Sequence, residues 1–229
     1  MKKVILWDFQ GTLAHNDWMF SKAMYKAIQH YESDSKICID DIKKSPLSGF
    51  PWQEPERDYS HIACSDTWWE HVQPIFIDAF RNLNFSDEKA ILYAGKVRYE
   101  VAKSEEYSLY DDTLEVLDFF KKNGFANIIL SNHIPELPQI VEALGLSVYL
   151  EDCISSANVG YEKPNRRIYE YALEKTMKPD IVWMVGDSLV ADVKGAENAG
   201  IKGVLVRSKC QEAIKYYSKD LIGLKGIIR

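Results

Sequence analysis

Four short apolar runs, separated by stretches with helical spacing, limit most strongly what this chain can fold into. The runs are VILW at 4–7, ANIIL at 126–130, IVWMV at 181–185 and GVLV at 203–206. Near-continuous apolar runs are typical of strands that are covered on both faces, and strands that alternate with helices form parallel sheets. The sequence therefore predicts an α/β fold built on a parallel, Rossmann-like sheet.

Helix signals lie between these runs. Asp112 and Glu115 form a candidate capping box ahead of an apolar stripe, and Gly124 is a suitable helix stop. Similar patterns predict three further helices: residues 135–144, residues 166–176, and a helix that starts after Ser188 and ends near Gly200.

Residues 15–105 have a different pattern. Apolar side chains recur there every three or four residues, which is typical of amphipathic helices, and no stretch favours a strand. We expect three helices: residues 20–31, residues 68–83 with a kink at Pro74, and a helix capped by Ser86 that ends near residue 101. The segment is thus predicted to be an all-helical insertion into a core formed by residues 1–14 and 106–229.

Composition narrows the class of protein. A chain of 229 residues that is 46% hydrophobic can bury one core and a smaller appendage. Its net charge is −6 and its basic residues are scattered, which argues against nucleic acid as a partner. No apolar stretch approaches the roughly 20 residues of a membrane span. The four cysteines form no CxxC pair, which favours reduced thiols and a cytoplasmic location.

Polar residues follow three of the predicted strands. Asp8 ends the first run, Ser131-Asn132 follows the second, and Gly186-Asp187 follows the third. Ligands of open parallel sheets bind outside the carboxyl ends of the strands, at the point where the strand order reverses. We therefore expect these side chains to meet in one site.

Jointly, these residues resemble the motifs of the haloacid dehalogenase (HAD) superfamily. The family's motifs are DxDx[TV], a Ser or Thr after a strand, a lysine commonly followed by proline, and GDxxxxD. In this order they are matched by residues 8–12 (DFQGT), Ser131, Lys163-Pro164 and residues 186–192 (GDSLVAD). The resemblance implies a HAD-like core of residues 1–14 and 106–229, with residues 15–105 as a helical cap of the family's first type.

The resemblance also implies roles in phosphoryl transfer to or from a small phosphorylated substrate. Asp8 would be the nucleophile and form an aspartyl phosphate. Lys163 would neutralise both Asp8 and the phosphoryl group. The oxygens of the phosphoryl group would be bound by the Ser131 hydroxyl and the Asn132 N–H, with Thr12 as a further candidate.

A metal ion is expected because a carboxylate and a phosphate dianion repel each other. Mg²⁺ prefers oxygen ligands. The expected ligands are Asp8, the backbone carbonyl of Gln10, and Asp187, with Asp192 acting directly or through water.

Gln10 departs from the family pattern. Phosphatases of the family have a second aspartate there, which protonates the leaving alkoxide and later activates water. Glutamine cannot exchange a proton near neutral pH, and general acid–base catalysis contributes about 10²–10⁴-fold. The interpretation is a weakened phosphomonoesterase, in which His15 or His133 is a candidate replacement proton donor.

Two alternatives remain beside it, and a third, dehalogenation, is disfavoured. Loss of turnover would leave a binding protein for phosphate and metal. A phosphonate hydrolase would need a Schiff-base lysine in the cap, and none of four lysines matches that role: Lys22, Lys26, Lys43 and Lys44. Dehalogenases lack the acids of the last motif, so Asp187 and Asp192 argue against that activity.

The insertion contains a long segment, residues 44–61, with three prolines and one glycine. Loops of this length are usually functional or mobile. We expect substrate contacts from this segment and from the start of the insertion, where the candidates are Trp18, Trp52, Arg57 and His61.

Overall fold

A six-stranded parallel sheet forms the centre of the computed structural model, which describes residues 1–209 and 214–229. The strand order is β5-β4-β1-β6-β7-β8, and the prediction of a parallel α/β sheet is confirmed. The strands are β1 (Lys3–Trp7), β4 (Phe125–Ser131), β5 (Asp152–Ser155), β6 (Ile181–Gly186), β7 (Lys202–Val206) and β8 (Tyr217–Ser218). The four apolar runs became β1, β4, β6 and β7, whereas the short β5 and β8 were not predicted.

Strand β1 lies between β4 and β6, with Trp7 opposite Ile129 on one side and Val185 on the other. From β1 the chain continues through β4 and β5 on one side, then crosses to β6 on the other. The order therefore reverses between β1 and β6, where ligands of such sheets bind.

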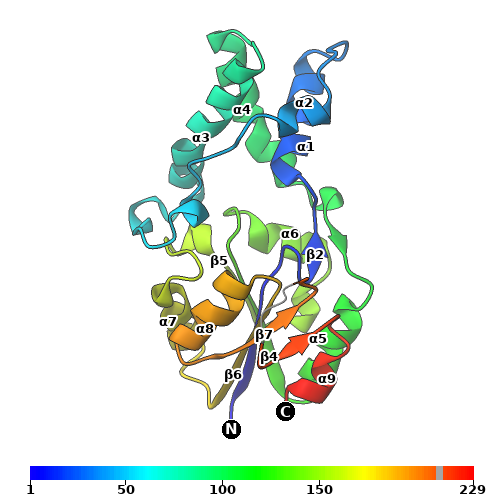
Figure 1. The fold of residues 1–229 in the computed structure, drawn as a ribbon, viewed down its shortest axis with the longest axis vertical. Coiled ribbons are helices and arrows are strands. Elements are labelled where there is room, and N and C mark those ends of the chain that lie inside the picture. The colour runs from blue at the N-terminus through cyan, green and yellow to red at the C-terminus, as the bar shows by residue number, and fades with distance from the viewer. Residues whose placement is uncertain (210–213) are drawn as a thin grey trace.

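Helices cover both faces of the sheet (Figure 1). Side chains alternate along a strand, so Ile5 and Trp7 of β1 face one layer while Val4 and Leu6 face the other. The first layer contains α5 (Thr113–Lys122), α6 (Leu137–Ala143) and α9 (Leu224–Ile227), and the second contains α7 (Arg166–Lys175) and α8 (Gly195–Asn198). Coverage on both faces explains why these strands are apolar at nearly every position.

A separate group of helices stands beyond the carboxyl ends of the strands, on the side away from both termini (Figure 1). It comprises α1 (Met19–Tyr31), α2 (Ile39–Lys43), α3 (Ser65–Asn82) and α4 (Asp87–Val101). The three predicted helices are confirmed, and Ser86 caps α4 by accepting a hydrogen bond from the Lys89 N–H. Helix α3 continues through Pro74. Helix α2 was not predicted.

The chain leaves and re-enters the core through two short antiparallel strands. These are β2 (Ala14–His15) and β3 (Ser108–Leu109), which pair with each other and were not predicted. Short 3₁₀ turns complete the elements: Pro51–Gln53, Ser60–Ile62, Ser104–Glu106, Ser147–Tyr149 and Ser156–Asn158. The segment of residues 44–61 thus contains the first of these turns and the start of the second.

Two predicted helix details differ in the structure. The capping box at Asp112 is wrong, because Asp112 has a helical backbone and its carboxylate pairs with Arg207 and accepts from the Leu221 N–H. The helix expected after Ser188 is present, but it begins as a π-helix (Leu189–Lys194) and continues as α8. Such widened turns are frequent at functional sites.

Among the described residues, no helix is both long and apolar enough to cross a membrane. Cys38, Cys64 and Cys153 are free thiols, and Cys210 lies outside the described residues.

Candidate active site

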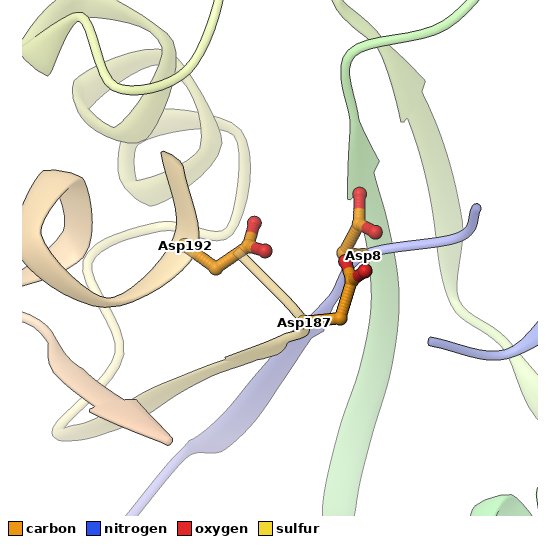
Figure 2. Close-up of side chains that lie close together, drawn as sticks. All are labelled: Asp8, Asp187 and Asp192. Carbon is orange, nitrogen blue, oxygen red and sulfur yellow. The ribbon is translucent and has the colours of Figure 1, made fainter. Parts of the chain in front are cut away.

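Three strand ends bring acidic and hydroxyl side chains together at the switch point. Asp8 follows β1, and its N–H continues the pairing with β6 by donating to the Val185 carbonyl at 2.9 Å. Ser131 is the last residue of β4, and Asp187 follows β6. Figure 2 shows the carboxylates of Asp8 and Asp187 side by side, with that of Asp192 directed toward them.

Hydrogen bonds hold the Asp8 carboxylate from three directions. Its Oδ1 accepts from the Ser131 hydroxyl and from the Lys163 ammonium, each at 2.8 Å. Its Oδ2 accepts from the Thr12 hydroxyl at 3.3 Å. Asp8 is only 6% exposed. The carboxylate is therefore oriented by rigid strand ends rather than by solvent.

Lys163 bridges two acids. Its Nζ lies 2.8 Å from Asp8 Oδ1 and 2.5 Å from Asp192 Oδ1, and the side chain is buried. Burial alone would lower the pKa of this ammonium, but Asp192 and Asp8 outweigh burial and hold the pKa above its ordinary value. Lys163 is thus a permanent cation in the site.

The Asn132 side chain positions Lys163. Its Oδ1 accepts from the Lys163 N–H at 2.7 Å, and its Nδ2 donates to the Lys163 carbonyl at 2.8 Å. Sequence analysis assigned only the Asn132 backbone N–H a role. The amide clamp links the end of β4 to the loop before α7, and nothing in the local sequence indicates this contact.

Asp192 reaches the site from the π-helix. Its Oδ2 accepts from the Ser188 N–H at 2.9 Å, opposite the Lys163 contact on Oδ1. A Cβ at Gly186 would lie 2.1 Å from Asp192 Cγ, so glycine is required for this approach. The spacing of the GDxxxxD motif therefore has a steric cause.

The three acids can hold a divalent cation. Ligand oxygens of Asp8, Asp187 and Asp192 lie within 4.8 Å of one another. Burial, with Asp8 and Asp192 adding repulsion, raises the pKa of Asp187 to about 7. Three acids faced by one lysine carry excess negative charge, and carboxylate oxygens are ligands that Mg²⁺ prefers. The donor set therefore fits Mg²⁺.

Gln10 lies in the tight turn after β1. Its side-chain Oε1 is buried and has no hydrogen-bond partner within the described part of the chain. The next residue, Gly11, has φ +88°, and a Cβ there would lie 2.5 Å from Asp187 Oδ2. Gln10 lines the cavities described below, and glycine is required at position 11 to make room for Asp187.

A cavity of about 480 Å³ opens beside Lys163. It lies between the core and the helical segment, and its lining residues are Gln10, Met19, Trp52, Pro55, Asn132, His133, Lys163, Pro164, Ser188, Val190 and Ala191. Of the aromatic candidates, Trp52 lines this cavity. Trp18 lines a neighbouring one of about 410 Å³, which shares Gln10 and Met19.

The other candidates from the helical segment lie elsewhere. Arg57 pairs with Glu54 at 3.5 Å and lies over the Tyr59 ring, and neither it nor the exposed His61 lines the cavity. The lysines considered for a Schiff base are also engaged: Lys22 with Asn16, Lys26 with Glu106, Lys43 with Asp40 and Lys44 with Asp41.

The two histidines differ in position. His133 is fully buried between the rings of Phe9 and Tyr107, and both ring nitrogens lack partners among the described residues. Burial lowers the pKa of His133 to about 4, so the imidazole is neutral at pH 7. His15 is half-buried in β2 and packs on Tyr110, away from the cavity lining. His133 therefore offers no cationic proton donor to the cavity at pH 7, and His15 does not line the cavity.

Sequence analysis missed several residues of the site. Arg207 donates from Nε to the Thr12 carbonyl at 3.0 Å and lies 3.8 Å from the Tyr110 ring centroid, so it braces the loop after β1. Met19 and Pro55 line the cavity from the helical segment. They lie in the two stretches from which substrate contacts were expected, but neither residue was itself a candidate. Ser188 and Val190 lie within the GDxxxxD motif, and that motif could have indicated them.

Comparison with known proteins agrees with this geometry. The family described as haloacid dehalogenase-like hydrolase matches residues 2–200. The chain therefore belongs to the HAD-like hydrolases. Solved structures share the fold: the HAD hydrolase YfnB of Bacillus subtilis, bound to magnesium, has a TM-score of 0.74 at 18% identity, covering 99% of this chain and 98% of that one.

Named relatives include phosphatases. A glyceraldehyde 3-phosphate phosphatase of Methanothermobacter thermautotrophicus is 34% identical over 56% of this chain, and the match spans 58% of that protein. A phosphoserine phosphatase of Thermus thermophilus is 32% identical over 69% of this chain and 68% of its own length. The mouse HAD-like hydrolase domain-containing protein 3 is 27% identical over 89% of this chain and 81% of its own length.

Proposed function

We propose that this HAD hydrolase is a Mg²⁺-dependent phosphomonoesterase that acts on a small phosphorylated metabolite through an aspartyl phosphate on Asp8. The observation that carries the proposal is the Asp8 carboxylate, held by Ser131 and Lys163 and faced by Asp187 and Asp192. The phosphatase relatives support the same reaction class. In this proposal residues 1–14 and 106–229 are the catalytic core, and residues 15–105 are its cap.

The first chemical step is attack of an Asp8 carboxylate oxygen on phosphorus. A bond forms between Asp8 and phosphorus while the ester P–O bond breaks, and the electron pair of that bond leaves with the alcohol oxygen. Lys163 balances negative charge on Asp8 and on the phosphoryl oxygens, and Ser131 and the Asn132 N–H supply hydrogen bonds to them. Asn132 keeps Lys163 in place through its side-chain clamp.

Asp8, Asp187 and the Gln10 carbonyl would hold Mg²⁺, with Asp192 nearby, and the ion would reduce the repulsion between carboxylate and phosphate. Asp192 has hydrogen bonds on both oxygens, which supports a main role in holding Lys163.

Gln10 limits both proton transfers. It offers only an amide to the leaving oxygen, which must take its proton from water, and it can orient a water molecule but cannot deprotonate it. Hydrolysis of the aspartyl phosphate, in which water attacks and inorganic phosphate leaves, should therefore be slow. Substrates with good leaving groups, such as aryl or acyl phosphates, are favoured.

The test is pre-steady-state phosphate chemistry with an aryl phosphate and Mg²⁺. We expect a burst of phenol close to one equivalent per enzyme, followed by slow turnover. Gln10→Asp should raise steady-state turnover at least tenfold, and Asp8→Asn should abolish the burst. Absence of an Asp8-dependent burst and of any Asp8-dependent phosphate release would refute the proposal.

A binding protein without turnover is the second candidate, and Gln10 is the observation in its favour. It predicts that phosphate and Mg²⁺ bind while neither the parent nor Gln10→Asp releases phosphate. A phosphonate hydrolase is not supported, because no lysine of the helical segment lines the cavity beside Lys163 in the described chain.

A further inference from the structure

The charge of the cavity beside Lys163 restricts what can occupy it. Lys163 is the one ionised side chain among the described lining residues, and both Asp8 and Asp192 already neutralise it. Four lining residues are polar but uncharged: Gln10, Asn132, His133 and Ser188. The other six are apolar: Met19, Trp52, Pro55, Pro164, Val190 and Ala191.

An aromatic stack supports the apolar wall. Trp52 stacks on Phe50 with ring centroids 4.7 Å apart and planes 9° apart, and Phe50 stacks on Phe20 at the same distance. Trp52 is therefore fixed within the helical segment, and it adds apolar aromatic surface to the cavity lining.

The segment that carries Trp52 is also tied to the core. The Asn165 side chain donates to the Pro55 carbonyl at 3.0 Å, and the Tyr59 N–H donates to the Gly160 carbonyl at 2.9 Å. A Cβ at Gly160 would lie 2.4 Å from Ser60 Cα, so the backbones pack in direct contact. The wall and Lys163 are thus held in one frame, since Gly160 and Asn165 flank Lys163 in the sequence.

Cations on the segments that contribute to the two cavities have partners of their own among the described residues. Arg57 pairs with Glu54, and Arg167 pairs with Asp58 at 3.1 Å. Lys43, in the neighbouring cavity, pairs with Asp40 at 3.1 Å and lies over the Trp18 ring. A second anionic group on the substrate would lose its hydration without gaining a cationic partner, which is strongly unfavourable.

We propose that the site selects phosphomonoesters whose leaving group is small and electrically neutral, with one flat or hydrocarbon face against Trp52 and Met19. This inference rests on the proposed phosphatase function and names its substrate class. The cavity adjoins the phosphate site through Lys163 and Asn132, and its volume of about 480 Å³ limits the leaving group to the size of a small metabolite. The unpartnered Gln10 Oε1 is available to accept a hydrogen bond from a hydroxyl of that group.

The experiment compares two esters that differ in one charge: phenyl phosphate and 4-carboxyphenyl phosphate, each with Mg²⁺. We expect kcat/KM for the neutral ester to be at least tenfold higher. Met19→Lys adds a cation to the wall and should lower this ratio at least fivefold, while Met19→Gln, of similar length and uncharged, should leave the ratio unchanged. Val190→Lys and Val190→Gln, at an exposed position on the rim, repeat the comparison if the Met19 variants do not fold.

Equal kcat/KM for the two esters, or a preference for the carboxylate, would overturn the inference while leaving the phosphatase function intact. Fast turnover of the carboxylate ester that Lys43→Met abolishes would overturn it too, by placing the leaving group in the neighbouring cavity. If neither ester shows Asp8-dependent phosphate release, the proposed function fails and the inference fails with it.

Discussion

The candidate site and the helical segment differ in where their charged side chains lie. In the candidate site, Asp8, Lys163 and Asp192 are each at least 94% buried, and the Lys163 Nζ lies 2.8 Å from Asp8 Oδ1 and 2.5 Å from Asp192 Oδ1. In the helical segment, the interior is aromatic and includes Trp68 and Phe76, and ion pairs such as those of Arg81 lie on the surface. Glu100 is a buried exception, and its carboxylate pairs with the partly exposed Lys103 at 2.5 Å.

The difference follows from the cost of burying charge. Buried charges lose hydration, so they must be paired and held in place, as they are here by the end of β1, the loop before α7 and the π-helix. Aromatic packing needs no such pairing and makes a stiff apolar wall. The two regions meet again at Glu136, beside α6, whose carboxylate accepts from the Ser65 hydroxyl at 2.7 Å, from Trp69 Nε1 at 3.0 Å and from Arg98 Nε at 3.2 Å.

Removal of the buried cation should have the largest effect on stability. Lys163→Met leaves Asp8 and Asp192 buried without a counter-charge, and we expect a loss of about 3–5 kcal/mol in the free energy of unfolding at pH 7. Urea denaturation in the absence of Mg²⁺ measures this. Burial raises the pKa of Asp192 to about 6 and that of Asp187 to about 7, so their protonation at pH 5 relieves the repulsion and the loss should shrink. A loss below about 1 kcal/mol at pH 7 would contradict the importance of the buried pairing.

Acid should weaken the protein through His133. Its pKa is about 4 in the folded protein and 6.5 in the unfolded chain, which therefore binds more protons between these values. Stability should fall as the pH drops from 6.5 to 4, by about 3 kcal/mol at 1.36 kcal/mol per pH unit. His133→Gln should flatten the decline by this amount. His61→Gln, at an exposed position, is the matched control. Parallel curves of stability against pH for the parent protein and both variants would disprove the role of His133.

The junction at Glu136 should have an intermediate effect. Glu136→Ala removes the acceptor shared by Ser65, Trp69 and Arg98, and we expect a loss of about 2 kcal/mol. Thermal denaturation measures it, and Glu142→Ala on the exposed side of α6 is the control. Equal stability of the two variants would mean that the junction contributes no more than a solvent-exposed position.

The surface ion pairs should have the smallest effect. Arg81→Ala removes contacts to Asp78 and Asp87, and the side chains of all three residues are about half exposed or more. We expect no change in the free energy of unfolding beyond the error of urea denaturation curves. A loss comparable to that of Glu136→Ala would break the contrast between the two regions.

Local pattern predicted the strands and helices that are long and regular. Strands β1, β4, β6 and β7 are continuous apolar runs, and the helices of residues 15–105 have clear periodicity. Strands β5 and β8 were not predicted because they are short and partly polar, so only their pairing with β4 and β7 defines them. The failed capping box at Asp112 has the same origin, because its partner Arg207 is 95 residues away.

The order of the motifs alone predicted which residues meet in the candidate site: an acid after the first strand, a hydroxyl after β4, a lysine, and two acids after β6. Only the tertiary structure decided that His133 is neutral at pH 7, that Asn132 clamps Lys163, and that Trp52 and Pro55 wall the cavity. The physical reason is the distance along the chain over which the interactions act. Strand and helix preferences depend on neighbours a few residues apart, whereas burial, pKa and cavity shape depend on groups brought together from across the whole chain.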